Sequence, residues 1–166
     1  MGRGGKMATN RAVLPNRGPR VAIPSHYGDL EVVRVDVTNW EAVFRVRSAD
    51  GLIGSEFKTR LSMIQPQSDE DKSQFWKMLV DDLVRVLKAK GEYPDFVKGY
   101  EVTTDRDSTG EPGLYVKILV KPAHGATDDA TVSKWNDFVN LVQDSLGRLR
   151  LQRWPYVELG EWRRRR

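Results

Sequence analysis

Three stretches of the chain show apolar and polar residues in alternation with a period of two: residues 30–37, 41–48 and 55–63. Alternation of this kind is typical of strands that bury one face and expose the other. In the first stretch it places Val33 and Val35 on one face and Val32 on the opposite face. Asn39–Trp40 forms a tight connection to the second stretch. We therefore expect three antiparallel strands in this part of the chain.

A helix is predicted next, between Ser68 and Gly91. Ser68 is a good N-cap, Asp71 three residues later makes a weak capping box, and Gly91 stands where helices commonly end. The apolar residues at helical spacing are Phe75, Trp76, Leu79, Val80, Leu83, Val84 and Leu87. A second helix is expected from Thr127 or Asp128. Its inward residues would be Val132, Trp135, Phe138, Val139, Val142, Leu146 and Leu149.

Further alternating stretches at residues 95–104 and 113–122 lie between the two helices, and a short one follows Pro155. Counted from the strand before the first helix, the order is β, α, β, β, α, β. This is the order of a ferredoxin-like two-layer sandwich. We therefore expect an α+β protein with a ferredoxin-like core, one sheet extended by an N-terminal hairpin, and basic tails. This fold supports many functions, so it does not identify one.

Charge is distributed unevenly along the 166 residues, whose net charge is +4. Residues 1–28 and 148–166 each have a net charge of +5, whereas residues 29–147 have a net charge of −6. We expect a basic extended arm over 1–28, one α+β domain over 29–162 and an arginine tail over 163–166. Cationic segments of this kind favour anionic partners. The candidate partner-binding residues are Arg3, Lys6, Arg11, Arg17, Arg20, Arg163, Arg164, Arg165 and Arg166.

One loop resembles the beginning of a calcium site. A calcium-binding EF-hand loop has oxygen ligands at positions 1, 3 and 5, glycine at 6 and a bidentate glutamate at 12. The first four conditions are met by Asp105, Asp107, Thr109 and Gly110. Position 12 is Val116, which has no ligand atom, and predicted strands flank the loop. We therefore expect a β-hairpin connection, with an adventitious cation site as the alternative.

Residues that typically build catalytic, cofactor or metal sites do not form a recognisable motif. The chain has no cysteine, and His26 and His124 lack the spacing of a zinc-binding helix. We find neither a phosphate-binding loop nor a nucleophile elbow. No apolar run approaches the ~20 residues of a membrane span. We therefore expect a non-enzymatic protein without cofactor, metal or membrane partner.

The helices of a two-layer sandwich cover one sheet face and leave the other open. The polar sides of the predicted strands would gather Arg34, Arg45, Arg47, Lys58, Arg60, Tyr115, Lys117 and Lys121 on that open face. An open basic face with an aromatic residue resembles the way RNA-recognition sheets bind single strands. Alternatively, the face is merely solvated, and its charges pair across strands. The acids available for such pairs are Glu31, Asp36, Glu41, Glu56 and Glu101.

Two functions follow from these patterns. In the first, the protein is a structural subunit of a larger assembly, a virion or a nucleoprotein particle, and docks on other protein subunits through its basic tails. In the second, it is a nucleic-acid-binding module that uses the basic sheet face. We expect the first, because the positive charge is concentrated in segments that flank an acidic body. Either function places the protein in the cytoplasm or in a virion.

Overall fold

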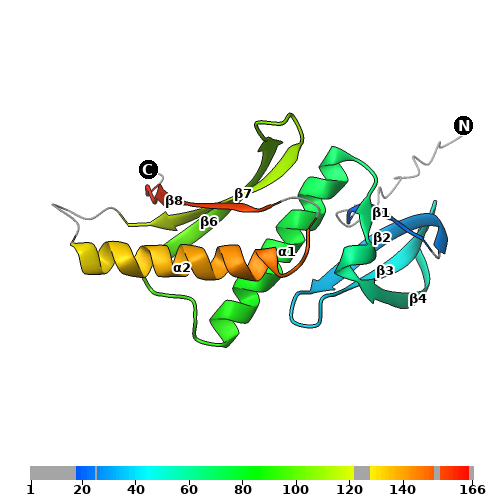
Figure 1. Cartoon of the computed structure of the whole chain (residues 1–166). Coiled ribbons are helices and arrows are strands. Elements are labelled where there is room, and N and C mark those ends of the chain that lie inside the picture. The colour runs from blue at the N-terminus through cyan, green and yellow to red at the C-terminus, as the bar shows by residue number, and fades with distance from the viewer. Residues whose placement is uncertain (1–17, 25, 122–127, 152–153, 165–166) are drawn as a thin grey trace, which may run out of the picture.

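The computed structural model describes residues 18–24, 26–121, 128–151 and 154–164. In this part of the chain, two sheets lie on either side of the helix α1, and α2 packs beside them (Figure 1). The strands are β1 (Arg20–Ile23), β2 (His26–Asp36), β3 (Glu41–Ser48), β4 (Gly51–Arg60), β5 (Gln65–Pro66), β6 (Val97–Arg106), β7 (Pro112–Val120) and β8 (Tyr156–Glu161). The helices are a short 3-10 helix (Leu61–Met63), α1 (Asp69–Ala89) and α2 (Asp129–Gly147).

The first sheet has five strands in the order β4-β3-β2-β1-β5, and all its neighbours are antiparallel. The three predicted antiparallel strands are confirmed as β2, β3 and β4. The prediction that Val33 shares a face with Val35 was wrong, because the register of β2 shifts between Val32 and Arg34. This bulge turns Val32 into the core and leaves Val33 exposed.

The connection between β2 and β3 is held by a single carboxylate. Asp36 accepts hydrogen bonds from the backbone nitrogens of Thr38 and Asn39, at 3.0 and 3.1 Å, and from the Asn39 side-chain amide at 2.8 Å. These hydrogen bonds hold the pKa of Asp36 below its usual range, and the hydrogen bond from the Asn39 side chain makes the largest contribution. Trp40 takes a left-handed conformation with φ of 55°, which is unusual for a bulky residue.

Helix α1 begins and ends as the sequence predicts. Ser68 is its N-cap and accepts a hydrogen bond from the backbone nitrogen of Asp71 at 3.1 Å. The Asp71 carboxylate accepts another from the backbone nitrogen of Arg20 at 2.8 Å, which ties the start of the helix to β1. Gly91 follows the helix with φ of 71°. All seven apolar residues predicted for the core face of this helix are buried.

Two consecutive aspartates attach α1 to both sheets. Asp82 accepts a hydrogen bond of 3.0 Å from the backbone nitrogen of Val37, the residue directly after β2. Asp81 accepts one from the hydroxyl group of Tyr100, on β6, at 2.6 Å. Burial raises the pKa of Tyr100, and the neighbouring carboxylate raises it further. One core of buried residues accordingly runs from the first sheet through α1 to the second.

The second sheet has three strands in the order β6-β7-β8. Strands β6 and β7 form an antiparallel hairpin, and β8 lies parallel to β7 after the crossover through α2. Asp128 caps α2 by accepting a hydrogen bond from the Thr131 backbone nitrogen at 2.6 Å, so the predicted start of this helix is confirmed. The helix buries Phe138, Val142 and Leu146, whereas Val132, predicted to point inward, is exposed.

The architecture is mixed α+β, but the strand order does not confirm the predicted ferredoxin-like topology. That topology requires the strand before the first helix to share a sheet with the later strands. The strand there, β5, pairs instead with β1. The N-terminal strands therefore form a separate sheet and do not extend the second one. None of the described helices is long and apolar enough to cross a membrane.

Candidate interaction surfaces

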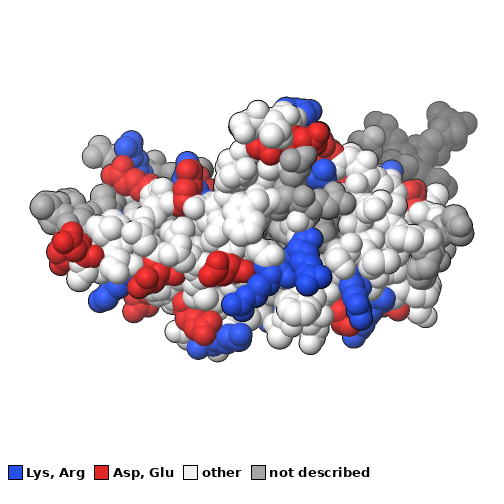
Figure 2. Space-filling view, in the orientation of Figure 1, with Lys and Arg blue, Asp and Glu red and all other residues white. Residues whose placement is uncertain are grey.

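The eight residues predicted for a single nucleic-acid face lie on two different sheets. The five-stranded sheet carries Arg34, Arg45, Arg47, Lys58 and Arg60. In the three-stranded sheet, Tyr115 and Lys117 lie on β7, and Lys121 directly follows this strand. The structure therefore does not bring the eight residues together on one sheet. In the view of Figure 2, acidic and basic side chains are interspersed.

Ion pairs across strands occupy much of the outer face of the five-stranded sheet. Arg34 on β2 donates a hydrogen bond of 2.9 Å to Glu56 on β4 and forms an ion pair with its second carboxylate oxygen, also at 2.9 Å, and Arg45 on β3 reaches the same carboxylate at 3.2 Å. The Arg34 hydrogen bond is the main reason that the pKa of Glu56 lies below its usual range. The same contact raises the pKa of Arg34. One glutamate thus links all three strands.

A second ion pair on this face is buried. The Arg47 guanidinium donates to Glu31, whose exposed fraction is only 4%, and the Arg47 side chain is only 10% exposed. Glu31 also accepts a hydrogen bond of 2.6 Å from the backbone nitrogen of Gly18. The hydrogen bond to Glu31 is the main cause of a raised pKa of Arg47. This pair holds β2, β3 and the chain before β1 together.

Lys58 and Arg60, both on the edge strand β4, differ from the three paired arginines. Both side chains are exposed, and neither forms an ion pair within the described part of the chain. Phe57, the residue before Lys58, lies opposite Phe44 and stacks on its buried ring with centroids 5.6 Å apart, so this ring lies on the other face of the sheet from Lys58 and Arg60. Of the five predicted residues on this sheet, these two are therefore the ones available to an anion.

The outer face of the three-stranded sheet has a different chemistry. Strand pairing sets Thr103, Tyr115 and Tyr156 in one row and Glu101, Lys117 and Glu158 in the next. The rings of Tyr115 and Tyr156 are stacked, with centroids 4.9 Å apart and an interplanar angle of 15°. Both helices pack on the opposite side of this sheet, where Val116, Ile118 and Val120 are buried.

A shallow pocket of about 260 Å³ lies on this face. It is lined by Glu101, Thr103, Asp105, Tyr115, Lys117 and Glu158. We call these six residues together with Tyr156 the tyrosine face. Partial desolvation raises the pKa of the Tyr115 hydroxyl, and the neighbouring Tyr156 and Asp105 raise it further. The sequence placed Tyr115, Lys117 and the acid Glu101 on an open sheet face, but it did not predict the contribution of β8, because the parallel pairing of β7 with β8 has no local signal.

The predicted hairpin between β6 and β7 is confirmed. Asp107 accepts hydrogen bonds from the backbone nitrogens of Thr109 and Glu111, at 2.8 and 3.2 Å, and from the Thr109 hydroxyl at 2.5 Å. Gly110 supplies the positive φ of 81° that this turn requires. The residues that resemble calcium ligands therefore build the turn itself. Among the described residues, no group of three acidic or histidine side chains could hold a metal ion.

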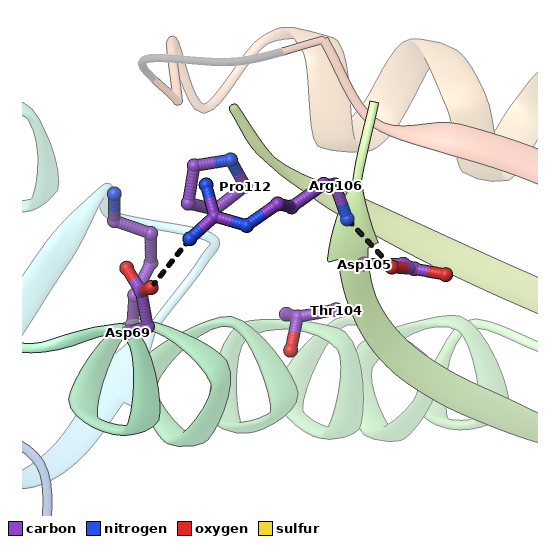
Figure 3. Close-up of a pocket in the computed structure, with 6 residues that line it drawn as sticks. Asp69, Thr104, Asp105, Arg106 and Pro112 are labelled. Carbon is purple, nitrogen blue, oxygen red and sulfur yellow. Dashed lines mark hydrogen bonds and ion pairs between the residues drawn. The ribbon is translucent and has the colours of Figure 1, made fainter. Parts of the chain in front are cut away.

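A second pocket, of about 200 Å³, lies between this hairpin and the start of α1. Figure 3 shows Arg106 pointing from the hairpin toward Asp69, and the two charged groups are 3.9 Å apart. Thr104, Asp105, Pro112 and Lys72 complete the lining. Its two acidic and two basic residues balance each other, so the pocket presents no excess charge to a ligand.

The predicted tail residues are only partly described. Residues 20–23 of the predicted arm form strand β1, and the backbone nitrogen of Arg20 donates to Asp71 at the start of α1. Arg163 pairs with Glu161 at 3.0 Å, and Arg164 is exposed. The remaining candidates, which lie outside the described residues, are Arg3, Lys6, Arg11, Arg17, Arg165 and Arg166. The predicted division into arm, domain and tail stays a prediction.

Comparisons with protein-family models, with curated proteins and with solved structures found no match to this chain.

Proposed function

We propose that the protein is a non-enzymatic structural subunit of an assembly that contains further copies of the same chain, a virion or a nucleoprotein particle. The observation that carries this proposal is the opposition of charge within one chain. Both terminal segments have a net charge of +5, and the body between them has a net charge of −6. Such opposite charges attract one chain to another and steer their encounter. The cytoplasm or a virion is the location that accompanies this role.

The fold supports a role as a rigid block. Helix α1 is fastened to one sheet through Asp82 and to the other through Asp81, and the buried core is continuous across both. The open face of the first sheet is locked by the Arg47–Glu31 and Arg34–Glu56 pairs. A body of this kind keeps its surfaces in fixed positions, which a subunit packed against its neighbours requires.

The proposal is tested with the full chain and a tail variant in which the following residues become serine: Arg3, Lys6, Arg11, Arg17, Arg163, Arg164, Arg165 and Arg166. Sedimentation velocity on nucleic-acid-free protein, at low and at high salt, measures self-association. We expect the natural chain to associate at low salt and to dissociate as salt screens the charges. The tail variant should remain monomeric throughout. A natural chain that stays monomeric at low salt, or a tail variant that associates equally well, would overturn the proposal.

The second candidate function is binding of single-stranded nucleic acid, favoured by the exposed side chains of Lys58 and Arg60, which form no ion pair within the described part of the chain. Unpaired cations of this kind neutralise the phosphates of a single strand. Replacing Lys58 and Arg60 by serine should then weaken binding. For single strands, the log of the affinity falls with log salt by about 0.7 per phosphate contacted, so the variant's slope should be shallower. Binding that depends only on the terminal arginines would favour the first function.

A further inference from the structure

Within the described part of the chain no helix covers the tyrosine face, and this surface has more acidic than basic groups. Glu101, Asp105 and Glu158 contribute three carboxylates, and Lys117 contributes the one ammonium group of the pocket. Lys117 binds Glu158 at 3.5 Å. Asp105 accepts a hydrogen bond from the backbone nitrogen of Arg106 at 2.7 Å. Glu101 is exposed and forms no ion pair within the described part of the chain.

The absence of a side chain at Gly160 allows the Lys117 side chain to run across β8. A Cβ atom at Gly160 on β8 would lie 2.5 Å from Cδ of Lys117, so the stem of the lysine runs across this glycine. Lys117 is thereby directed toward β8 and toward its partner Glu158. Glu101 lies on the other side of β7, on β6, and keeps its charge uncompensated. The face therefore offers an anionic group beside stacked tyrosine rings.

This combination fits an arginine side chain. A guanidinium group stacks on aromatic rings and forms paired hydrogen bonds with a carboxylate, which an ammonium group does less well. Tyr156 is 42% exposed, and Glu158 lies two residues further along the same strand, whereas Glu101 lies in the row next to Tyr115. The pocket of about 260 Å³ lies open next to these groups. The chemistry of the face thus points to a basic, arginine-containing peptide segment.

The chain itself contains two such segments, and the C-terminal one is already paired in part. The backbone nitrogen of Trp162 donates to the carbonyl oxygen of Val120 at 2.8 Å, so the chain leaves β8 at the end remote from Tyr156. Directly after Trp162, Arg163 already binds Glu161. Residues 1–17 instead contain four basic residues and no acid. Fully extended, such a segment spans up to about 60 Å.

We propose that the tyrosine face binds residues 1–17 of a second copy of the chain, with arginine side chains of that segment stacked on Tyr115 and Tyr156 and paired with Glu101 and Glu158. The inference rests on the proposed function and names the surface through which neighbouring subunits connect. Figure 1 shows β1, which follows the N-terminal segment, on the opposite side of α1 from β6 and β7. To reach the tyrosine face of its own molecule, the N-terminal segment would have to pass around α1. Binding to the tyrosine face of a neighbouring copy does not require this path.

The test uses full-length variants. The face variant carries Glu101→Gln and Glu158→Gln. The arm variant carries Arg3→Ser, Lys6→Ser, Arg11→Ser and Arg17→Ser. A control carries Asp137→Asn and Asp144→Asn, two exposed positions on α2, and changes the net charge as much as the face variant does. Sedimentation velocity at low salt gives the dissociation constant of each, and circular dichroism verifies folding.

We expect the face variant and the arm variant each to associate at least about tenfold more weakly than the natural chain. The control should associate like the natural chain. A second face variant, Tyr156→Ala, should also weaken association if the rings hold the guanidinium group. A face variant that associates normally, or a control that is weakened equally, would overturn the proposal.

Mixing the two defective variants separates exchange between chains from folding back within one chain. The arm of the face variant and the face of the arm variant are both intact, so the mixture should form heterodimers. The chain has no cysteine, so Ser133→Cys on the exposed side of α2 allows one partner to be labelled with a fluorophore. A mixture that stays monomeric would contradict the binding of one chain's N-terminal segment to the tyrosine face of another chain. If the tail variant dissociates while the face variant does not, the structural role stands and this docking surface is wrong.

Discussion

The two sheets share the core around α1 but use their charged residues in different ways. On the five-stranded sheet, Arg47 and Glu31 are buried together, and Glu56 links Arg34 with Arg45. On the three-stranded sheet, one exposed pair lies beside two stacked tyrosines and further carboxylates. Charge that is paired across strands holds a sheet together, whereas unpaired charge remains available to a partner. The larger sheet leaves the cations Lys58 and Arg60 unpaired, whereas the smaller sheet presents an excess of carboxylates, which directs the search for the binding surface of a basic partner to the smaller sheet.

The largest effect is expected where the two sheets meet. Trp76 on α1 is 4% exposed and belongs to the core that includes both sheets. Trp76→Ala should lower the free energy of unfolding by about 3–5 kcal/mol, as large-to-small core changes do. Denaturant unfolding, followed by circular dichroism, measures this loss and should show one transition for both sheets. Two separate transitions would show that the sheets are independent units.

Trp154 provides the matched control for this prediction. It is 62% exposed, although its ring covers Gly147. Trp154→Ala removes the same side chain from the surface and should change the free energy of unfolding by less than about 1 kcal/mol. An equal loss of unfolding free energy in both variants would mean that burial in the core does not explain the effect of Trp76→Ala.

The second prediction compares one acidic residue from each sheet. Glu31→Ala leaves the Arg47 guanidinium buried without its partner, and the loss should be about 3 kcal/mol, near the lower end of that expected for a broken buried pair. Glu158→Ala removes the partner of the exposed Lys117 and should change stability by less than about 1 kcal/mol. Urea unfolding of both variants checks the comparison. Equal losses would contradict the distinction between a structural and an available charge.

The sequence predicts the local elements well because each has a local signal. Ser68, Gly91 and the seven apolar residues of α1 stand where helix ends and a buried helix face require them. The hairpin around Asp107 and Gly110 follows from turn chemistry, which also disfavoured the calcium site. Alternation likewise predicts β2, β3 and β4, but it misses the bulge that exposes Val33.

The sequence does not predict the assignment of strands to sheets. The two residues of β5 could have joined either sheet, and their pairing with β1 depends on distant contacts. The parallel contact between β7 and β8 is equally non-local, and it creates the stack of Tyr115 on Tyr156. Sequence alone therefore placed Tyr115 among basic residues, while the structure places it among carboxylates.

The smallest predicted effect concerns pH and the exposed charges of the five-stranded sheet. The hydrogen bond from Arg34 holds the pKa of Glu56 below its usual range in the folded protein. A carboxylate of this kind stabilises the fold above its unfolded-state pKa, about 4.3 for glutamate, and this contribution disappears as the pH falls through the lower folded-state value. Glu56→Gln should therefore destabilise the protein at pH 7 and have little effect at pH 2.

Arg34→Gln tests the cause of this pH dependence. If the Arg34 contact is the main source of the lowered pKa, most of the pH-dependent difference between Glu56 and its glutamine variant should vanish in the Arg34→Gln background. Arg45, which also reaches Glu56, accounts for any remainder. Urea unfolding of the four proteins at both pH values gives the coupling directly. If Glu56→Gln destabilised the protein more at pH 2 than at pH 7, the pH dependence would be opposite to the expected one. The Arg34–Glu56 contact would then not stabilise the sheet.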